Sequence, residues 1–269
     1  MVININWNVF PADNRMVYLE KILKNENIDS KYISNVYILP IPVTRDKVHI
    51  LNSDILLSDY FSGLEDNSLV LCGNKSLIPK DLISENQVFD YSDSELFLLK
   101  NANLTSHGVI KILCENSSFP FNKLKFLILG FGRIGKNLTK LLLGLESKIY
   151  VFGHSEKDLF WSNKFGISYV KNLDNFKENI DFVINTIPHE IISEKQLKKQ
   201  CFALAQFIEL ASYPGIKSET CQNIGIEHIS ALGIPGKIYP KQAAEIIKES
   251  ILNIIFSLIK QKEEKNEEK

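Results

Sequence analysis

The stretch "KFLILGFGRIGKNL", Lys125–Leu138, decides the fold of this chain. Its apolar run ends at Gly130, and Gly132 and Gly135 complete the spacing G-x-G-x-x-G. Between a strand and a helix, the first glycine permits a tight turn, the second lets a pyrophosphate approach the backbone, and the third lets helix and strand pack closely. A turn that holds no ligand is the alternative. The flanking strand and helix favour a dinucleotide site, with phosphates facing the helix N-terminus, made of Gly130, Gly132, Arg133, Ile134 and Gly135.

Apolar segments alternate with helical segments on both sides of this motif, which indicates parallel sheets covered by helices. After the linker we expect strands at "KFLILG", "KIYVFG", "DFVINT", "FIELAS" and the short "EHISAL". Before it we expect strands at "VININWNV", "VYILPIPV", "SLVLCGN" and "QVFDYS", one helix capped by Asp13 or Asn14, and another near "PKDLISEN". The fold class is therefore α/β, with two doubly wound parallel-sheet domains of the Rossmann-like kind.

The polar stretch "CENSSFPFNK", which contains Pro120, reads as the linker between two domains. We expect a flavodoxin- or Rossmann-like substrate domain over 1–118 and a dinucleotide-binding domain over 119–240. A helix over 241–260 is expected to pack back in the groove between them, because Lys241, Glu245, Lys248 and Glu249 argue against a membrane span. The charged residues 261–269 are expected to be disordered.

The composition excludes several classes of protein. The chain has 269 residues, 45% of them hydrophobic, and a net charge of −1, so no global field favours nucleic acid or an anionic membrane. The N-terminus does not read as a signal peptide, and the four cysteines form no C-x-x-C pair. We therefore expect a reduced, cytoplasmic protein without a metal site. The histidines outside any metal-ligand spacing read as surface or packing residues: His49, His189 and His228.

The end of the second strand, "YVFGHSEKD", bears on the choice of cofactor. NAD sites carry an acid about here that binds the ribose, whereas this chain has Gly153, His154 and Ser155, with Lys157 beyond. A hydroxyl, an imidazole and an ammonium would accept a 2′-phosphate that an acid would repel. NADP is therefore preferred over NAD. The alternative is that nearby Glu156 or Asp158 supplies the acid.

Three later strand ends are expected at the same edge of the sheet as the glycine turn, where an open α/β sheet binds its ligand. Thr186 and Pro188 in "INTIP" should close a loop over the cofactor. Glu209 lies within an apolar strand and is expected to make a structural hydrogen bond. Lys237, in the stiff turn "GIPGKIYP", is either a cation beside the cofactor or a solvated loop lysine.

With these residues in view, the chain resembles the family of dipicolinate synthase A chains. The resemblance is carried by "LGFGRIGKNL", "INTIP", "IELASYPGI" and "ALGIPGKIYPKQAAEII", and more weakly by "ADNR", "ILPIPVTRD" and "NANLTSHG". It implies an NADP-dependent oxidoreductase that oxidises a dihydrodipicolinate-type ring to dipicolinate during sporulation. It also implies, as partner, the flavoprotein-like second subunit of dipicolinate synthase, and a place in the mother cell of a spore former. Assembly of several copies stays open.

Two departures from the family pattern concern the site. "FPAD" stands where the family has a glycine-containing "GGD" approach to the first helix. His107 stands where the family has an acidic residue, so any proton chemistry there would pass to His107.

A substrate with two carboxylates needs cationic partners, and arginine binds a carboxylate in bidentate fashion. Arg15 and Arg45 both follow expected strand ends, and Arg45 follows the rigid "PIPV" segment. The candidate catalytic set is Arg45, Thr105, His107 and Lys237. Two other functions remain open: a non-catalytic nucleotide-binding regulatory protein, and a small-acid dehydrogenase like shikimate dehydrogenase. The second would require a spaced Lys–Asp pair, whereas Asp46 and Lys47 are adjacent.

Overall fold

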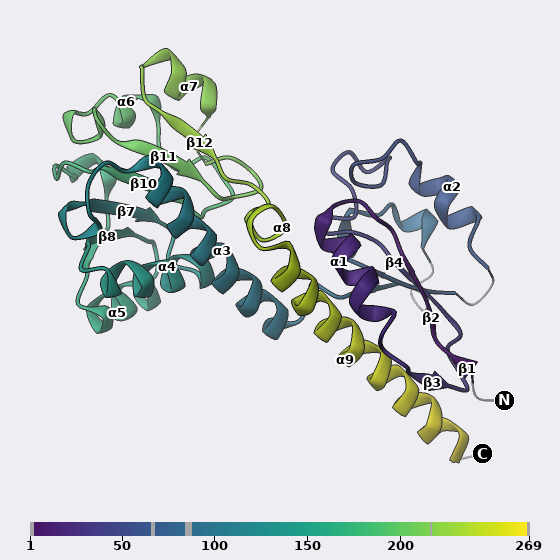
Figure 1. The fold of residues 1–269 in the computed structure, drawn as a ribbon. Coiled ribbons are helices and arrows are strands. Elements are labelled where there is room, and N and C mark those ends of the chain that lie inside the picture. The colour runs from purple at the N-terminus through teal and green to yellow at the C-terminus, as the bar shows by residue number, and fades with distance from the viewer. Residues whose placement is uncertain (1–2, 66–67, 84–87, 216, 268–269) are drawn as a thin grey trace. The chain divides into compact units, whose positions relative to one another are not determined.

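The computed structural model describes residues 3–65, 68–83, 88–215 and 217–267. The chain divides into two compact units, one formed by Met1–Asn101 with Pro235–Lys269 and the other by Ala102–Ile234 (Figure 1). The division after Asn101 falls inside the long helix α3 (Glu95–Asn116), and not at the polar stretch around Pro120. A continuous helix carries no break in composition, which is why the sequence suggested a boundary at 118/119 instead. The second division likewise falls after Ile234 and not after 240.

The second unit holds a sheet of six parallel strands in the order β9-β8-β7-β10-β11-β12. The order reverses between β7 and β10, which is the point where open α/β sheets bind ligands. The five strands expected after the linker are confirmed, and β9 is an addition. The strands are β7 (Lys125–Leu129), β8 (Lys148–Phe152), β9 (Ser168–Val170), β10 (Phe182–Asn185), β11 (Gln206–Glu209) and β12 (His228–Ser230).

Short helices connect these strands: α4 (Arg133–Gly144), α5 (Glu156–Phe165), η4 (Leu173–Asn175), α6 (Glu194–Leu197), η5 (Gln200–Phe202) and α7 (Ser218–Asn223), with η3 (Phe121–Lys123) before β7. The central strands are buried along almost their whole length, as parallel strands covered on both faces must be. Phe126 of β7 stacks on Phe182 of β10 with ring centroids 5.6 Å apart. This packing holds the two strands that flank the switch point.

The first unit has a parallel sheet in the order β2-β4-β5-β6, which follows the chain without a reversal. Its strands are β2 (Asn6–Val9), β4 (Asn35–Ile38), β5 (Leu69–Cys72) and β6 (Val88–Asp90), beside an antiparallel pair of β1 (Ile3–Asn4) and β3 (Asp29–Ser30). The expected α/β class with two parallel sheets is therefore confirmed.

The helical segments of this unit are α1 (Asn14–Leu23), α2 (Leu57–Ser62), η1 (Lys75–Leu77), η2 (Lys80–Leu82), α8 (Ile234–Ile238) and α9 (Pro240–Glu267). Asp13 caps α1, as the sequence predicted. The helix expected near "PKDLISEN" is only the short turn η2, and residues 84–87 lie outside the described part.

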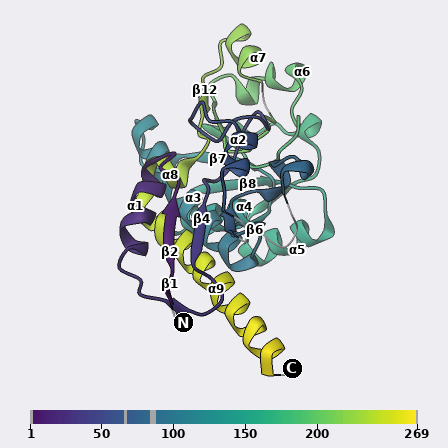
Figure 2. The same cartoon turned by 90° about the vertical axis from the view of Figure 1, so that its right-hand side faces the viewer.

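Helix α9 packs along α1 within the first unit, and both views show the two helices side by side (Figures 1 and 2). Its buried side chains include Ile247, Ile251 and Ile255. The expectation of a disordered tail from 261 was wrong as far as Glu267, because α9 continues to that residue. Lysine and glutamate are good helix formers, and Lys260 and Glu264 lie one turn apart at 3.9 Å. Among the described helices, none is long and apolar enough to cross a membrane.

Candidate functional site

The glycine turn between β7 and α4 has the shape of a phosphate cradle. Gly130 has φ +94°, and a Cβ there would lie 2.5 Å from Thr186 Oγ1, so no other residue fits without strain. A Cβ on Gly135 would lie 2.3 Å from the carbonyl oxygen of Gly130, which brings helix and turn into close contact. Gly132, the N-cap of α4, has open space where its Cβ would be, and no side chain caps the helix. A phosphate can therefore reach the backbone N–H groups at the start of α4.

The loop after β10 closes directly on this turn. The hydroxyl of Thr186 donates to the carbonyl oxygen of Leu129 at 2.9 Å, and the backbone N–H of Thr186 donates to the same oxygen. Thr186 is half-buried, whereas Pro188 is exposed two residues further along. The structure thus brings Thr186 to the glycine turn, at the carboxyl edge shared by β7 and β10.

A buried polar pair holds this loop in place. Asn185 and Glu209 are 0% and 2% exposed, and the amide of Asn185 donates to both carboxylate oxygens at 2.9 and 3.0 Å. Glu209 also accepts from the backbone N–H groups of Ala211 and Gly215 at 2.8 and 2.9 Å. Asn185 in turn binds both the N–H and the carbonyl of Ile187. Glu209 therefore makes the structural hydrogen bonds expected of it, and they join the loops after β10 and β11.

The end of β8 opens into a cavity of about 950 Å³. His154, Tyr169 and Lys171 line it together with the rings of Tyr150 and Phe152. The hydroxyl of Tyr169 donates to the carbonyl of Gly153 at 2.7 Å, which ties β9 to the end of β8. Aromatic walls suit a flat base, and the ammonium of Lys171 with the imidazole of His154 suits an anion.

The other residues expected at this point have different surroundings. Ser155 caps α5: its hydroxyl accepts from the N–H of Asp158 at 3.1 Å, and the Asp158 carboxylate accepts from the N–H of Ser155 at 3.3 Å. That carboxylate lies against Gly153, where a Cβ would be 2.9 Å from Asp158 Oδ2. Lys157 is exposed on α5 and is not among the residues that line the cavity. It lies near Lys136, whose pKa is lowered mainly by burial and then by the charge of Lys157.

Arg133 and Ile134 begin helix α4. Arg133 is exposed, and the carbonyl of Ile134 accepts a hydrogen bond from Ser106 of α3 at 3.3 Å. Thr105 and His107 also belong to α3, but Thr105 is buried and His107 is exposed. Two residues turn a helix by roughly 200°, so these side chains point to different faces. These two members of the candidate catalytic set therefore do not share a face of α3.

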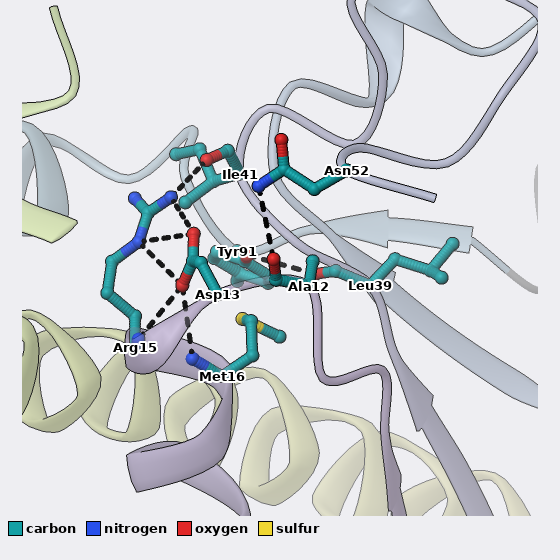
Figure 3. A network of polar contacts seen from close by, with 8 residues as sticks. All are labelled: Ala12, Asp13, Arg15, Met16, Leu39, Ile41, Asn52 and Tyr91. Atoms are coloured by element: carbon teal, nitrogen blue, oxygen red, sulfur yellow. Dashed lines mark hydrogen bonds and ion pairs between the residues drawn. The ribbon is translucent and has the colours of Figure 1, made fainter. Parts of the chain in front are cut away.

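A second polar cavity, of about 480 Å³, lies in the first unit after β4 and is lined by Arg45, Asp46 and residues 49–54. Arg45 is exposed and, among the described residues, has no hydrogen-bond or ion-pair partner. The amide of Asn52 donates to the carbonyl of Ala12 at 3.1 Å, which ties the cavity loop to the turn before α1 (Figure 3). The structure therefore presents Arg45 as a cation that can bind an anionic ligand.

Arg15 is engaged in the fold. Its guanidinium binds Asp13 Oδ2 at 2.6 Å and the carbonyl of Ile41 at 2.7 Å, and its side chain is 12% exposed (Figure 3). A Cβ on Gly236 would lie 2.5 Å from Arg15 Nε, so α8 also packs on this side chain. The possibility that Arg15 clamps a carboxylate is not supported, because its Nε and Nη2 donors bind Asp13 and Ile41. Lys237, next to Gly236, is exposed and belongs to the first unit.

Sequence reasoning missed Lys171 and Tyr169, which only the pairing of β8 with β9 brings to the end of β8. It also passed over His49, whose ring contacts Asp46 at the spacing Asp-x-x-His. Among the described residues, no group of three His, Cys, Asp or Glu side chains could hold a metal ion.

Comparison with known proteins identifies the domain type. Residues 113–207 match the NAD-binding domain of the D-isomer-specific 2-hydroxyacid dehydrogenases. The chain is 25% identical over 175 residues to the dipicolinate synthase A chain of Bacillus subtilis (strain 168). That match covers 64% of this chain and 58% of the relative, so it spans less than two thirds of the relative's length.

Solved structures show the same fold over nearly the whole chain. The dipicolinate synthase A chain from Bacillus halodurans superposes with a TM-score of 0.76 at 17% identity, covering 94% of this chain and 96% of that one. The Bacillus subtilis A chain superposes with a TM-score of 0.75 at 19% identity, covering 97% and 96%. The resemblance predicted from the sequence is confirmed: this chain is similar to the dipicolinate synthase A chains in sequence and in fold, and its residues 113–207 match an NAD-binding domain of the dehydrogenase type.

Proposed function

We propose that this chain is the NADP-dependent component of a dipicolinate synthase, which oxidises a dihydrodipicolinate-type ring to dipicolinate. One observation carries the proposal: the cradle at Gly132 is open, in a chain homologous to the dipicolinate synthase A chains. The proposal includes the flavoprotein-like second subunit of that enzyme as partner and a role in sporulation, in the mother cell. Both extend what the resemblance implies.

The residues of the second unit fit a dinucleotide. Gly130, Gly132 and Gly135 shape the cradle, and the backbone N–H groups of Arg133 and Ile134 stand at the start of a helix that no side chain caps. Thr186 borders the turn from the end of β10, and Pro188 follows it in the same loop. The cavity beside β8 would take the adenosine half. When bound, the nicotinamide supplies a two-electron acceptor for the oxidation.

The preference for NADP rests on charge. Cationic or polar side chains at the end of β8 would bind a 2′-phosphate, and these are His154, Lys171 and the hydroxyl of Ser155. Two carboxylates oppose this assignment, those of Asp158 and of Glu178, which lines the cavity beside β8. Asp158 accepts from the N–H of Ser155, which favours its role as a helix cap over that of a ribose ligand. Glu178 accepts from the hydroxyl of Tyr150 at 3.0 Å.

The substrate needs partners for two carboxylates, and Arg45 is the first of them. Its guanidinium, which has no partner in the described part of the chain, lines a polar cavity, where a bidentate bond to a carboxylate would orient the ring. Lys237, exposed on α8 of the same unit, stays in the proposed catalytic set.

The test is a turnover assay. The purified chain is mixed with freshly generated dihydrodipicolinate and either NADP or NAD, with and without the flavoprotein-like second subunit, and NADPH fluorescence is followed. We expect NADPH to form, faster than NADH. Binding of NADP without turnover, even with the second subunit present, would identify a regulatory protein. Oxidation of shikimate in place of dihydrodipicolinate would identify a small-acid dehydrogenase.

A further inference from the structure

A carboxylate and an imidazole form a pair in the cavity that Arg45 lines. Asp46 Oδ2 and His49 Nδ1 lie 2.7 Å apart, and their side chains are 53% and 42% exposed. The charged and titratable groups that line this cavity with His49 are Arg45, Asp46 and Asp54. An imidazole oriented by a carboxylate, in a cavity that an arginine also lines, suits proton transfer to or from an anionic ligand.

The backbone turn fixes the carboxylate of Asp46. Its Oδ1 accepts from the N–H groups of Val48 and His49 at 2.9 and 2.8 Å and from the hydroxyl of Thr44 at 3.0 Å. Lys47 has φ +64°, and this left-handed residue turns the chain so that His49 returns to the carboxylate. Only Oδ2 therefore faces the ring. The contact with His49, with the backbone N–H groups, holds the pKa of Asp46 well below its ordinary value, so the carboxylate is ionised.

The loop that carries the pair is anchored at several points. The N–H of Leu51 donates to the carbonyl of Val43 at 2.9 Å, and the N–H of Leu57 donates to the carbonyl of Val48 at 2.8 Å. Asn52 binds Ala12, as Figure 3 shows, and Ile50, which lines the cavity, is buried. The imidazole is therefore held by a supported loop, although its own side chain reaches solvent.

An ionised carboxylate can only accept a hydrogen bond, so Nδ1 of His49 must carry the hydrogen. In the neutral ring Nε2 then bears the lone pair, which can take a proton. The two side chains together make a base with a defined accepting atom.

We propose that His49 is the proton acceptor of the oxidation, that Asp46 is its positioning residue, and that Arg45 holds a substrate carboxylate beside them. This inference rests on the proposed function. Aromatisation removes two ring hydrogens. One would leave with its electron pair as a hydride, for which a bound oxidised nicotinamide would be the acceptor. The other C–H bond breaks to give a proton, which goes to Nε2 of His49, and its electron pair becomes the new ring double bond. His49 then returns the proton to water.

The first test does not depend on turnover. The imidazole nitrogens of the full chain are observed by NMR, and the His49 signals are identified by their loss in His49→Gln. We expect the neutral ring to carry its hydrogen on Nδ1, and Asp46→Asn to shift it toward Nε2. Dipicolinate should move the His49 signals in the wild type but not in Arg45→Ala. An Nε2–H tautomer in the wild type, or signals that dipicolinate leaves unmoved, would overturn the proposal.

The second test is kinetic. His49→Gln should lower kcat by about 10²–10⁴-fold, with KM for the dicarboxylate and NADP affinity little changed, and should remove the acidic limb of the pH–rate profile. Asp46→Asn should lower kcat less, whereas Asp59→Asn, exposed on α2 and outside the cavity, should not. Wild-type kcat in His49→Gln, or a larger loss with the same change of profile in His107→Gln, would refute the assignment. If the wild type does not oxidise dihydrodipicolinate, the proposed function fails, and the NMR experiment still decides the role of the pair.

Discussion

Glu209 accepts two hydrogen bonds from Asn185 in a site where both side chains are buried, and the carboxylate has two further backbone donors from the loop after β11. Asn185 also accepts a hydrogen bond from the backbone N–H of Ile187 and so positions that residue. The side chain of Ile187 lies against the glycine turn, because a Cβ on Gly130 would be 2.8 Å from it. The buried pair therefore supports the glycine turn through Ile187, although neither Asn185 nor Glu209 belongs to the motif that predicts the cofactor.

Glu209→Gln should destabilise the second unit and weaken nucleotide binding. The amide would place hydrogens against at least one N–H donor, and the loss of charge-assisted bonds costs about 1.5–3 kcal/mol. Denaturant unfolding and calorimetric titration of NADP measure the two effects. Glu190→Gln is the matched control, because Glu190 is 58% exposed and its partner Lys217 lies at 3.4 Å. Surface pairs contribute about 0–1 kcal/mol. Equal effects of the two variants would show that Glu209 has no special role.

Gly132→Val should abolish measurable nucleotide binding without unfolding the protein. The backbone of Gly132 lies in the extended region, with φ −76° and ψ −155°, so valine can adopt it. Its side chain would fill the space that the pyrophosphate needs. Gly144→Val, at the other end of α4 and equally free of neighbours, is the control and should bind nucleotide normally. Titration with NADP and a thermal melt distinguish the outcomes. Binding by Gly132→Val at wild-type affinity would place the phosphate elsewhere.

His154→Asp should shift the cofactor preference toward NAD. The acid would repel a 2′-phosphate and could accept from the ribose hydroxyls. Lys171→Ala should weaken NADP by about 10–100-fold, the loss of one charge-assisted bond, and change NAD little. Calorimetric titration of each variant with both nucleotides measures this. Lys157→Ala tests the alternative position of the 2′-phosphate. If this variant loses more NADP affinity than Lys171→Ala does, the 2′-phosphate binds beside α5 and not beside Lys171.

The parts of this structure that the sequence predicted are local. The glycine spacing specified strand, turn and helix because each depends on a few adjacent residues. The parts that it did not predict depend on distant or geometric relations. Lys171 comes to the end of β8 through the pairing of β8 with β9. Thr105 and His107 are close in sequence, but this spacing places them on different faces of α3, where Thr105 is buried and His107 is exposed. The contact between Asp46 and His49 depends on the left-handed backbone of Lys47, and no residue pattern in this segment predicts that conformation.

Asp46 should make stability depend on pH. Its pKa is lowered in the folded state below the ordinary value of 3.8, chiefly by the hydrogen bond with His49 and then by the backbone N–H groups. The stabilisation is therefore present above about pH 3.8 and is lost as the pH falls toward the folded-state pKa. Asp46→Asn should melt at a lower temperature than the wild type near neutral pH, and the difference should shrink in acid. A difference in melting temperature that grows in acid would contradict this reading.

Arg45 and Arg15 offer a matched pair for testing the substrate clamp. Arg45→Ala should raise KM for the dicarboxylate by about one to two decades, the loss of one charge-assisted bond, and leave NADP affinity and stability nearly unchanged. Arg45→Lys should recover only part of the loss, because an ammonium cannot reproduce the bidentate contact. Arg15→Ala should instead destabilise the protein, because Asp13 and the carbonyl of Ile41 lose a partner whose side chain is only 12% exposed. Kinetics and denaturant unfolding of the three variants separate binding from folding. Wild-type kinetics in Arg45→Ala, or equal weakening of NADP and substrate, would remove Arg45 from the substrate site and leave its cavity without an assigned ligand.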